Sequence, residues 1–396
     1  MKPLELKKGV HWVGALDPDL RVFDVIMKSE RGTTYSSYLL RGLNGTALID
    51  SVKAKFAFEH LERIKELIEI KALDYIILNH TEPDHSGALS LLIDEAPQAK
   101  VVISKNAPHF LKNLMNRDIY PLKVGDGDYI DLGGRRLEFI SAPFLHWPDT
   151  MFTYSVQDRI LFPCDFLGCH FCDERMYNDL VDDFSFAFQY YFDHIMRPFR
   201  EHAQRAIERI SALNIDMIAP SHGPILRHDI QSYLSRYREW IEREPQVTRK
   251  ILVFYASAYG NTARMAREIA GGVREGGAQV TLFDVAGIDM SKVPDLVEEA
   301  DGIIVGSPTI NGDAVKAIWD LLSSLATIKL KGKIGGAFGS YGWSGEAIDM
   351  IDRRLKDLKF RVPLAPVKAA LTPTEEDLKG SKKLGFELTK FLSRKS

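Results

Sequence analysis

The fold of this chain is indicated by one stretch, Leu78-Asn79-His80-Thr81-Glu82-Pro83-Asp84-His85. It places four potential metal ligands within six residues, namely His80, Glu82, Asp84 and His85. The apolar run 75–78 predicts a short buried strand that ends where the ligands begin. Pro83 is expected to exclude a regular helix here and to stiffen a loop from which the ligands can converge on two adjacent ions.

Three more ligand-type residues follow apolar runs in the same way. They are His146, Asp165 and His222, which come after the predicted strands 135–141, 159–164 and 216–220. A lone histidine is more often a packed or surface residue than a ligand, and a polar loop usually carries solvated charges. Four strand ends that all deliver ligands, however, can meet at one edge of a fold. Together they predict a binuclear metal site.

The composition is that of a soluble globular protein. The chain has 396 residues, 45% hydrophobic and 27% charged, which suggests two or three domains. A net charge of −3 gives no reason to expect nucleic acid or an anionic membrane as a partner. No apolar run approaches the roughly 20 residues of a membrane span, and the N-terminus lacks a signal-peptide core. Three cysteines exclude a disulfide scaffold and favour the cytoplasm.

The order of expected elements separates two domains, 1–248 and 249–396, joined by a polar linker over 241–249. The first begins with β-hairpins over residues 9–50 and continues with strands that alternate with helices. A strand over 34–40 and three meandering strands over 119–141 belong to this region. This order predicts an α/β sandwich of two mixed sheets covered by helices.

The second domain predicts a doubly wound parallel sheet. A buried strand over 250–256 runs into the turn 257–262 and a helix over 263–273. Small and hydroxyl residues at such a turn can bind a phosphate at the helix N-terminus. No lysine follows the glycine, so this is not a nucleoside triphosphate loop. Further strands are expected at 279–284, 302–306, 333–338 and 366–370, each followed by a helix, with ligands at their carboxyl ends.

The ligand pattern of the first domain resembles the metallo-β-lactamase fold. Its binuclear motif is His-x-His-x-Asp-His, followed by a His, a bridging Asp and a final His. Glu82 stands where a zinc hydrolase of that fold carries its second His. Carboxylate-rich sites suit iron or manganese, whereas His-rich sites are typical of zinc. The charge of two divalent ions would be balanced by three carboxylates and a bridging hydroxide. A redox-active di-iron pair is therefore favoured over a zinc pair that activates water.

The second domain resembles flavodoxin, which implies FMN as a cofactor. Three loops at consecutive strand ends carry this resemblance, whereas one glycine turn alone would be ordinary for any α/β protein. The phosphate loop comprises Ser257, Ala258, Tyr259, Gly260, Asn261 and Thr262. The loop on one side of the flavin ring comprises Ser307, Pro308, Thr309, Ile310, Asn311 and Gly312. The loop on the other side comprises Ser340, Tyr341, Gly342, Trp343, Ser344 and Gly345.

The whole chain therefore resembles a flavodiiron protein, also called an A-type flavoprotein. The resemblance implies that His80, Glu82 and His146 hold one iron, that Asp84, His85 and His222 hold the other, and that Asp165 bridges them. It implies reduction of dioxygen to water, of nitric oxide to nitrous oxide, or of both, in defence against oxidative or nitrosative stress. Electrons would enter through FMN. His85 is the ligand whose coordination varies within the family.

Partners also follow from the resemblance. No rubredoxin or flavin reductase domain is expected on this chain, so a separate donor is implied: a rubredoxin or, as runner-up, a reduced deazaflavin coenzyme. A head-to-tail homodimer, or a dimer of dimers, would bring the FMN of one subunit to the iron pair of the other. Tyr190 aligns with a pocket tyrosine of the family that can donate a proton, although a core aromatic is an equal interpretation. Asp24 replaces a histidine found in many relatives.

Alternatives remain open at this point. Cys164, Cys169 and Cys172 flank the bridging Asp165, and the bland interpretation of them as loop cysteines is favoured over a redox pair or a zinc site. A zinc-dependent hydrolase fused to a flavodoxin is the main alternative function. An electron-transfer module with a metal-free first domain is the other, against which the complete ligand set argues.

Overall fold

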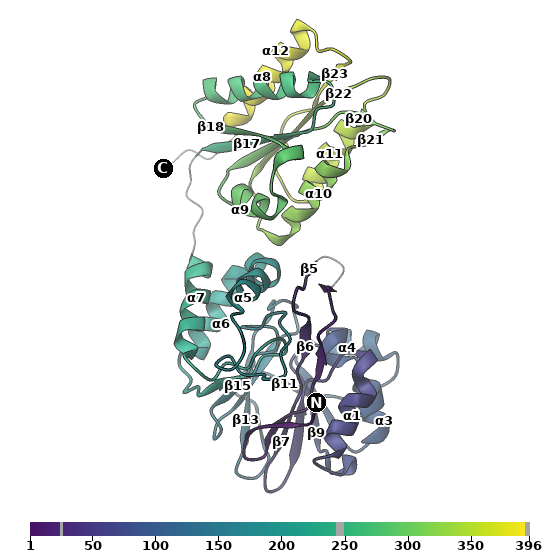
Figure 1. Ribbon diagram of the computed structural model, residues 1–396, viewed down its shortest axis with the longest axis vertical. Helices are drawn as coiled ribbons and strands as arrows, with labels where there is room; N and C mark the ends of the chain where they lie inside the picture. The colour runs from purple at the N-terminus through teal and green to yellow at the C-terminus, as the bar shows by residue number, and fades with distance from the viewer. Residues whose placement is uncertain (24–26, 243–248, 393–396) are drawn as a thin grey trace. The chain divides into compact units, whose positions relative to one another are not determined.

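The computed structural model describes residues 1–23, 27–242 and 249–392. The chain divides into two compact units, Met1–Arg243 and Glu244–Ser396, and each is described by itself (Figure 1). The expected domain boundary at 248/249 and most of the expected linker fall on 243–248, outside the described residues. Asp24 lies outside them as well.

Two mixed sheets form the first unit. The larger sheet has the order β1 (Leu4–Lys7), β2 (Val10–Trp12), β7 (Tyr38–Arg41), β8 (Thr46–Ile49), β9 (Tyr75–Leu78), β10 (Lys100–Ser104) and β11 (Leu122–Val124). The smaller sheet has the order β12 (Tyr129–Asp131), β13 (Arg136–Ser141), β14 (Met151–Ser155), β15 (Ile160–Phe162) and β16 (Met217–Ile218). Two short ribbons pair β3 (Ala15–Asp17) with β6 (Thr33–Tyr35) and β4 (Val22–Phe23) with β5 (Met27–Lys28).

Helices cover the outer faces of these sheets (Figure 1). They are α1 (Ala57–Lys65), α3 (Leu89–Glu95), α4 (Pro108–Met115), α5 (Ser185–Tyr191), α6 (Arg200–Ile210) and α7 (Ile230–Glu242). The short α2 (Pro83–Ser86) instead carries two of the predicted ligands, Asp84 and His85. Side chains alternate between the two faces of a strand. In β8, Ala47 and Ile49 therefore pack in the core between the sheets, whereas Leu48 packs in the cluster under the helices. The predicted sandwich is confirmed.

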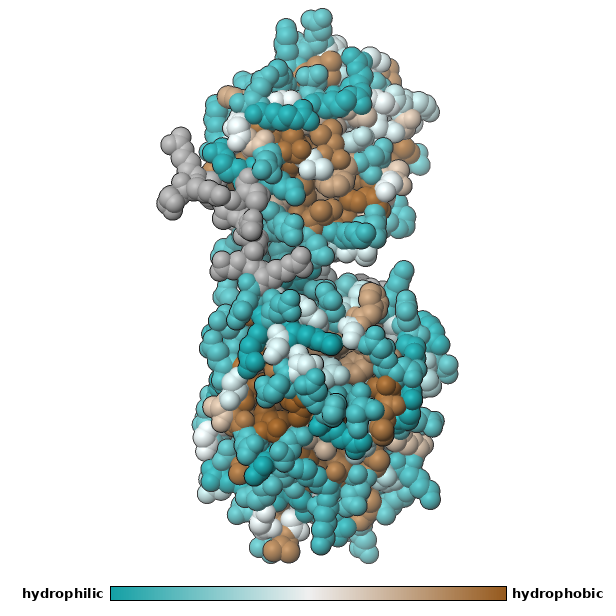
Figure 2. Space-filling model, turned by 60° about the vertical axis from the view of Figure 1, so that its left-hand side comes forward, coloured by the Kyte–Doolittle hydropathy of each residue, from teal (hydrophilic) through white to brown (hydrophobic). Residues whose placement is uncertain are grey.

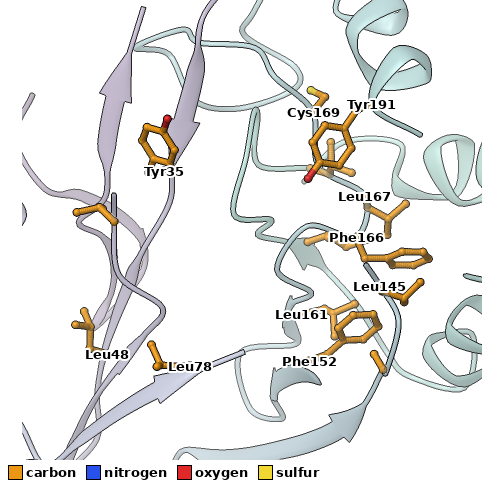
Figure 3. Packing of buried hydrophobic residues seen from close by; sticks show 14 of the residues in the cluster. Tyr35, Leu48, Leu78, Leu145, Phe152, Leu161, Phe166, Leu167, Cys169 and Tyr191 are labelled. Carbon is orange, nitrogen blue, oxygen red and sulfur yellow. The ribbon is translucent and has the colours of Figure 1, made fainter. Parts of the chain in front are cut away.

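The outer cluster contains residues from both sheets. Figure 3 shows Leu48 and Leu78 on strands of the larger sheet, and Phe152 and Leu161 on strands of the smaller one. Tyr191 of α5 belongs to the same cluster and is buried. The apolar face of the helices is thus packed against the strands that end at the predicted ligands.

Three local predictions for this unit were wrong. Pro83 does not exclude a helix: α2 begins at Pro83, because proline is tolerated where the first N–H has no helical partner. The strand expected over 34–40 is broken at Ser36, whose N–H donates to Ser221 O. The three meandering strands belong to two sheets, since β11 pairs in parallel with β10 while β12 begins the smaller sheet.

The second unit is a parallel sheet with helices on both faces (Figure 1). Its main strands are β17 (Lys250–Tyr255), β18 (Gln279–Asp284), β19 (Gly302–Gly306), β22 (Ile334–Tyr341) and β23 (Val367–Ala370). Their order, β18-β17-β19-β22-β23, is the flavodoxin-like order 2-1-3-4-5. A hairpin of β20 (Thr309–Ile310) and β21 (Asp313–Ala314) extends the sheet.

Helices pack on this sheet according to the alternation of its side chains. Ile251 and Val253 pack with α8 (Asn261–Glu275) and α12 (Glu375–Thr389). Leu252 and Phe254 pack on the other face, with α9 (Val293–Glu298), α10 (Lys316–Ser324) and α11 (Glu346–Asp357). The predicted doubly wound fold is confirmed.

The surface on the side drawn in Figure 2 is mainly hydrophilic, and hydrophobic residues are scattered in small groups. Within the described parts of the chain, none of the helices combines the length and the apolar character that crossing a bilayer requires.

Candidate metal centre and cofactor pocket

The predicted ligands of the first unit all lie just beyond strand ends. His80 follows β9, His146 follows β13, Asp165 follows β15 and His222 follows β16. Asn79 holds the first of these ends in place, because its N–H donates to Asp50 Oδ1 over 2.7 Å and its side chain bonds to Phe162 O over 3.1 Å. The loop that carries the ligands is therefore attached to both sheets.

The structure brings all seven predicted residues together in two groups. The first group consists of His80, Glu82, His146 and Asp165, and the second of Asp84, His85 and His222. In the first, Glu82 Oε2 lies 3.0 Å from His80 Nε2 and 3.1 Å from His146 Nε2. In the second, Asp84 Oδ2 lies 3.1 Å from His222 Nε2. In the first group two imidazole nitrogens converge on one carboxylate oxygen. In the second, the two imidazoles face different oxygens of Asp84, since His85 Nε2 lies 3.3 Å from Oδ1.

Asp165 connects the groups through its two oxygens. Its Oδ1 lies 3.1 Å from His85 Nε2 and 3.4 Å from His222 Nε2. Its Oδ2 lies 3.8 Å from His80 Nε2 and 3.9 Å from His146 Nε2. One oxygen therefore faces each group, which is the arrangement that a carboxylate bridging two ions requires. His85 lies within the second group, with Nε2 3.3 Å from Asp84 Oδ1.

Electrostatics in the cluster favour cations. Burial alone would lower the pKa of His85, but the carboxylates of Asp84 and Asp165 raise it to about 10. Burial alone would raise the pKa of Asp84, but the imidazoles of His85 and His222 lower it to about 2. Both shifts show that buried negative charge stabilises positive charge at this point. Metal ions that displace the imidazole protons would use the same field.

Several buried polar atoms of the cluster lack a hydrogen bond within the described residues. They are Asp84 Oδ1, Asp165 Oδ2 and both ring nitrogens of His85. An unsatisfied buried polar group costs about 1–3 kcal/mol. Four such atoms within one cluster fit a site whose remaining partners are metal ions, and the mixed imidazole and carboxylate donors suit iron.

Tyr191 contacts the cluster, whereas Tyr190, which was predicted as a pocket tyrosine, has no contact with a ligand side chain among the described residues. The Tyr191 hydroxyl is buried and donates to Asp165 Oδ1 over 3.0 Å. Tyr190 turns away: its ring stacks on Phe186 and His194, and Lys28 N–H donates to its hydroxyl over 3.4 Å. A π-helical turn over Phe192–Met196 directly follows the two tyrosines, and such turns are frequent at functional sites.

A Tyr191→Phe substitution should weaken the centre, whereas Tyr190→Phe should leave it nearly unchanged. Removing the Tyr191 hydroxyl takes away a hydrogen bond to a charged group, which contributes about 1.5–3 kcal/mol. We expect iron to be held about 10-fold less tightly, in line with changes to groups that orient ligands. Chelator competition on both variants measures this. Equal iron affinity in the two variants would contradict the assignment of Tyr191.

Two further residues near the cluster had no predicted role there. His170 is buried; its Nδ1 lies 2.9 Å from Thr33 Oγ1, and its ring lies 5.1 Å from that of His222. Cys164 groups with His85 and Asp165, since ligand atoms of the three lie within 4.8 Å of one another. For Cys164 the available signal was its place directly before Asp165, whereas the fold alone brings His170 to His222.

A pocket of about 200 Å³ lies beside the cluster, and its lining contains none of the seven predicted ligands. Tyr191 and His170, which both contact ligand side chains, form part of its wall, while Lys28 and Tyr190 line it as well. The side chain of Tyr191 therefore lies between a small molecule in this pocket and Asp165. Tyr190 belongs to this pocket and not to the cluster itself.

The second unit carries a pocket of about 350 Å³ at the carboxyl ends of β17, β19 and β22. Its lining comprises Ala258, Tyr259, Asn261, Pro308, Thr309, Ile310, Asn311, Gly312, Ser340, Tyr341, Gly342, Trp343, Ser344 and Leu371. All except Leu371 were predicted. Leu371 comes from the loop after β23, and its N–H donates to Tyr341 O over 2.7 Å. Sequence spacing gave no signal for it.

The other predicted residues of this unit shape the loops. Ser257 Oγ accepts a hydrogen bond from Ala263 N–H over 3.2 Å, and Ser307 Oγ accepts one from Val315 N–H over 3.2 Å. Buried Thr262 bonds to Ser340 over 2.9 Å and joins the first loop to the third. Gly260 has a φ of +82° before α8, and Gly345 precedes α11.

The pocket fits a planar aromatic ligand that carries a phosphate. Tyr259 is 93% exposed and Trp343 is 86% exposed, so two large aromatic faces have no protein partner covering them. A Cβ added at Gly260 or Gly312 would meet no atom within 4 Å, which leaves open space beside the backbone. The N-terminus of α8 adds free N–H groups and a positive dipole end.

The class of protein now follows from both sites: a binuclear metal centre on a metallo-β-lactamase-like sandwich, joined to a flavodoxin-like cofactor domain. Comparison with known families agrees. Residues 34–223 match the ODP family beta lactamase, and residues 253–385 match the flavodoxin family.

Named relatives complete the identification. The chain is 46% identical to type A flavoprotein fprA of Rhodobacter capsulatus, covering 99% of this chain and 92% of that one. It is 41% identical to flavo-diiron protein FprA2 of Clostridium acetobutylicum, covering 98% and 100%. It is 34% identical to anaerobic nitric oxide reductase flavorubredoxin of Aeromonas hydrophila, covering 98% and 79%. The chain belongs to the flavodiiron (type A flavoprotein) family.

A solved structure supports the same conclusion. Rubredoxin oxygen:oxidoreductase of Desulfovibrio gigas is 31% identical and superposes with a TM-score of 0.74. The similarity covers 99% of this chain and 98% of that one.

Proposed function

We propose that this chain is a di-iron and FMN oxidoreductase that reduces dioxygen to water, nitric oxide to nitrous oxide, or both. The observation that carries the proposal is Asp165, whose two oxygens face two separate groups of imidazoles and carboxylates. The family supports it, since relatives are named for reduction of oxygen and of nitric oxide. The alternative of a zinc hydrolase fused to a flavodoxin finds no comparable support.

His80, Glu82 and His146 would hold one iron, and Asp84, His85 and His222 the other, with Asp165 between them. When bound, the iron pair supplies two adjacent redox centres that can bind a diatomic gas. The chain's own residues have two functions at this site. Tyr191 donates a hydrogen bond to Asp165 Oδ1, and burial of the cluster excludes bulk water.

In the second unit, FMN would bind in the pocket at the strand ends, with its phosphate at the N-terminus of α8. Tyr259 and Trp343 would shield the ring, and Thr309, whose buried hydroxyl lacks a hydrogen bond within the described residues, would face the ligand. The loops of Ser257 and Ser307 hold their shape through hydrogen bonds to backbone N–H groups. When bound, FMN supplies the entry point for electrons.

The donor is proposed to be a rubredoxin, because the Desulfovibrio gigas relative is named for that donor. A head-to-tail homodimer is proposed as the working assembly, in which FMN of one subunit serves the iron pair of its partner. We also propose that this activity serves defence against oxidative or nitrosative stress in the cytoplasm.

Electrode assays of both gases with one reduced rubredoxin test the function. Iron and FMN are measured in the same anaerobic preparation. We expect two irons and one FMN per chain, and consumption of at least one gas. Zinc in place of iron, with hydrolase activity and no gas consumption, would overturn the proposal.

Glu82→His should change the metal preference of the first group from iron to zinc. The substitution removes one of the carboxylates and restores the His-rich pattern that suits zinc. We expect zinc to replace iron at this group after growth with both metals, with loss of gas consumption and unchanged FMN content. Metal analysis of the purified variant measures this result. Retention of two irons and full activity would show that Glu82 does not select the metal.

A further inference from the structure

Asp149 makes contacts that no ligand motif predicted. It lies three residues after His146, in the loop between β13 and β14, and its side chain is fully buried. Its Oδ1 lies 3.2 Å from His80 Nδ1. Its Oδ2 accepts two hydrogen bonds from Thr81, one from the backbone N–H over 2.9 Å and one from the hydroxyl over 2.6 Å.

These contacts determine which nitrogen of His80 carries a proton. A carboxylate only accepts hydrogen bonds, so the hydrogen bond at Nδ1 requires a proton on that nitrogen. Nε2 lies 3.0 Å from Glu82 Oε2 and faces the cluster, so by the same rule it carries a proton until a metal ion displaces it. The metal-bound ring then keeps only the proton on Nδ1, which Asp149 holds. A carboxylate behind a ligating imidazole also orients the ring and raises its basicity.

The contacts also connect two ligand loops. The loop after β13 supplies His146 to the first group. Through Asp149, the same loop also binds His80 and the backbone N–H of Thr81. The second group consists of Asp84, His85 and His222, and among the described residues none of these three is hydrogen-bonded or ion-paired to Asp149. Asp149 therefore acts on one metal position of the two.

We infer that Asp149 is a positioning residue that selects the Nδ1-protonated tautomer of His80 and thereby sets the iron affinity of the His80, Glu82 and His146 position. The inference rests on the proposed di-iron function and deepens it. Asp149 does not touch the reacting gas; its effect passes through the His80 ring.

Asp149→Asn separates this role from simple packing. The amide has nearly the same shape, and its oxygen can keep both donors of Thr81. Its NH₂ group then faces His80 Nδ1 and donates to it, which places the ring proton on Nε2, towards Glu82 and the metal. We expect iron affinity at this position to fall about 10- to 100-fold, as changes to outer-shell partners do. The second iron position should stay filled.

The experiment measures iron content by chelator competition and the Mössbauer spectrum of ⁵⁷Fe-loaded protein. The expected result is one altered or missing iron signal of two, with FMN content unchanged. Asp158→Asn is the matched control, because Asp158 is also a buried carboxylate with several donors, Ser155 and Arg135, but contacts no ligand of the cluster. Two irons with wild-type affinity and spectra in Asp149→Asn would overturn the inference.

A measurement on the wild-type chain covers the case in which Asp149→Asn does not fold. In the zinc-loaded protein, long-range ¹⁵N spectra should show the His80 proton on Nδ1. A proton on Nε2 would overturn the inference regardless of the variant. A wild-type chain that binds no iron would instead contradict the proposed function, so the two failures are distinguishable.

Discussion

Asp165→Asn should empty the metal centre and abolish gas reduction while leaving the flavin domain intact. The carboxylate faces four imidazoles, through Oδ1 towards His85 and His222 and through Oδ2 towards His80 and His146. An amide has one acceptor oxygen and no charge, so it cannot serve both groups. Iron should fall well below two per chain, and turnover should fall by more than the roughly 100-fold that outer-shell changes cause.

The measurement combines iron analysis with the electrode assay. FMN content is the internal control, since the pocket belongs to the other unit and should keep one FMN per chain. Asp158→Asn, a buried carboxylate away from the ligands, controls for a general loss of stability. If Asp165→Asn kept two irons and wild-type turnover, Asp165 would not be the bridge.

Asn261→Asp should have the converse effect: loss of FMN with both irons retained. Asn261 is the first residue of α8, follows Gly260 and lines the cofactor pocket. A carboxylate there would meet the FMN phosphate. Two unit charges 4 Å apart repel by about 4 kcal/mol at an effective dielectric constant of 20. That energy corresponds to a Kd about three orders of magnitude weaker.

Quenching of FMN fluorescence during titration of the flavin-free protein measures this Kd. Asn261→Ala is the matched control, because it removes the amide without adding a charge, and we expect a much smaller loss. High salt should partly restore binding to Asn261→Asp, since added ions screen the repulsion. Wild-type affinity in Asn261→Asp would place the phosphate elsewhere. Rubredoxin-driven gas consumption should be lost with FMN, even though iron analysis still finds two irons.

Much of this architecture could be predicted because its signals are local. Apolar runs such as 75–78 and 251–255 mark buried strands whatever lies around them, and the confirmed fold classes followed from the order of such runs. The loop 307–312 was visible as well, because it follows a predicted strand, but its hairpin turn at Asn311 and Gly312, both with positive φ, was not predicted. Ligand-type residues after each strand pointed to an edge where ligands gather.

Other features could not be predicted because they depend on contacts between distant segments. The break at Ser36 arises from a hydrogen bond to Ser221, far along the chain. The choice between Tyr190 and Tyr191 depends on how α5 and its π-helical turn lie against Asp165. The spacing of hydrophobic residues along the sequence does not indicate either contact. The helix at Pro83 was missed for a different reason, because proline was treated as a helix breaker at a position where it can begin one.

By itself, the sequence determined which donors this protein has: seven ligand-type residues after predicted strands, among them the carboxylate at Glu82, and three loops at consecutive strand ends. The tertiary structure alone decided how those donors are used. It set which oxygen of Asp165 faces which group, and it placed Asp149 behind His80. The physical reason is that residue type defines what an atom can donate or accept, whereas the folded sheets define which atoms meet.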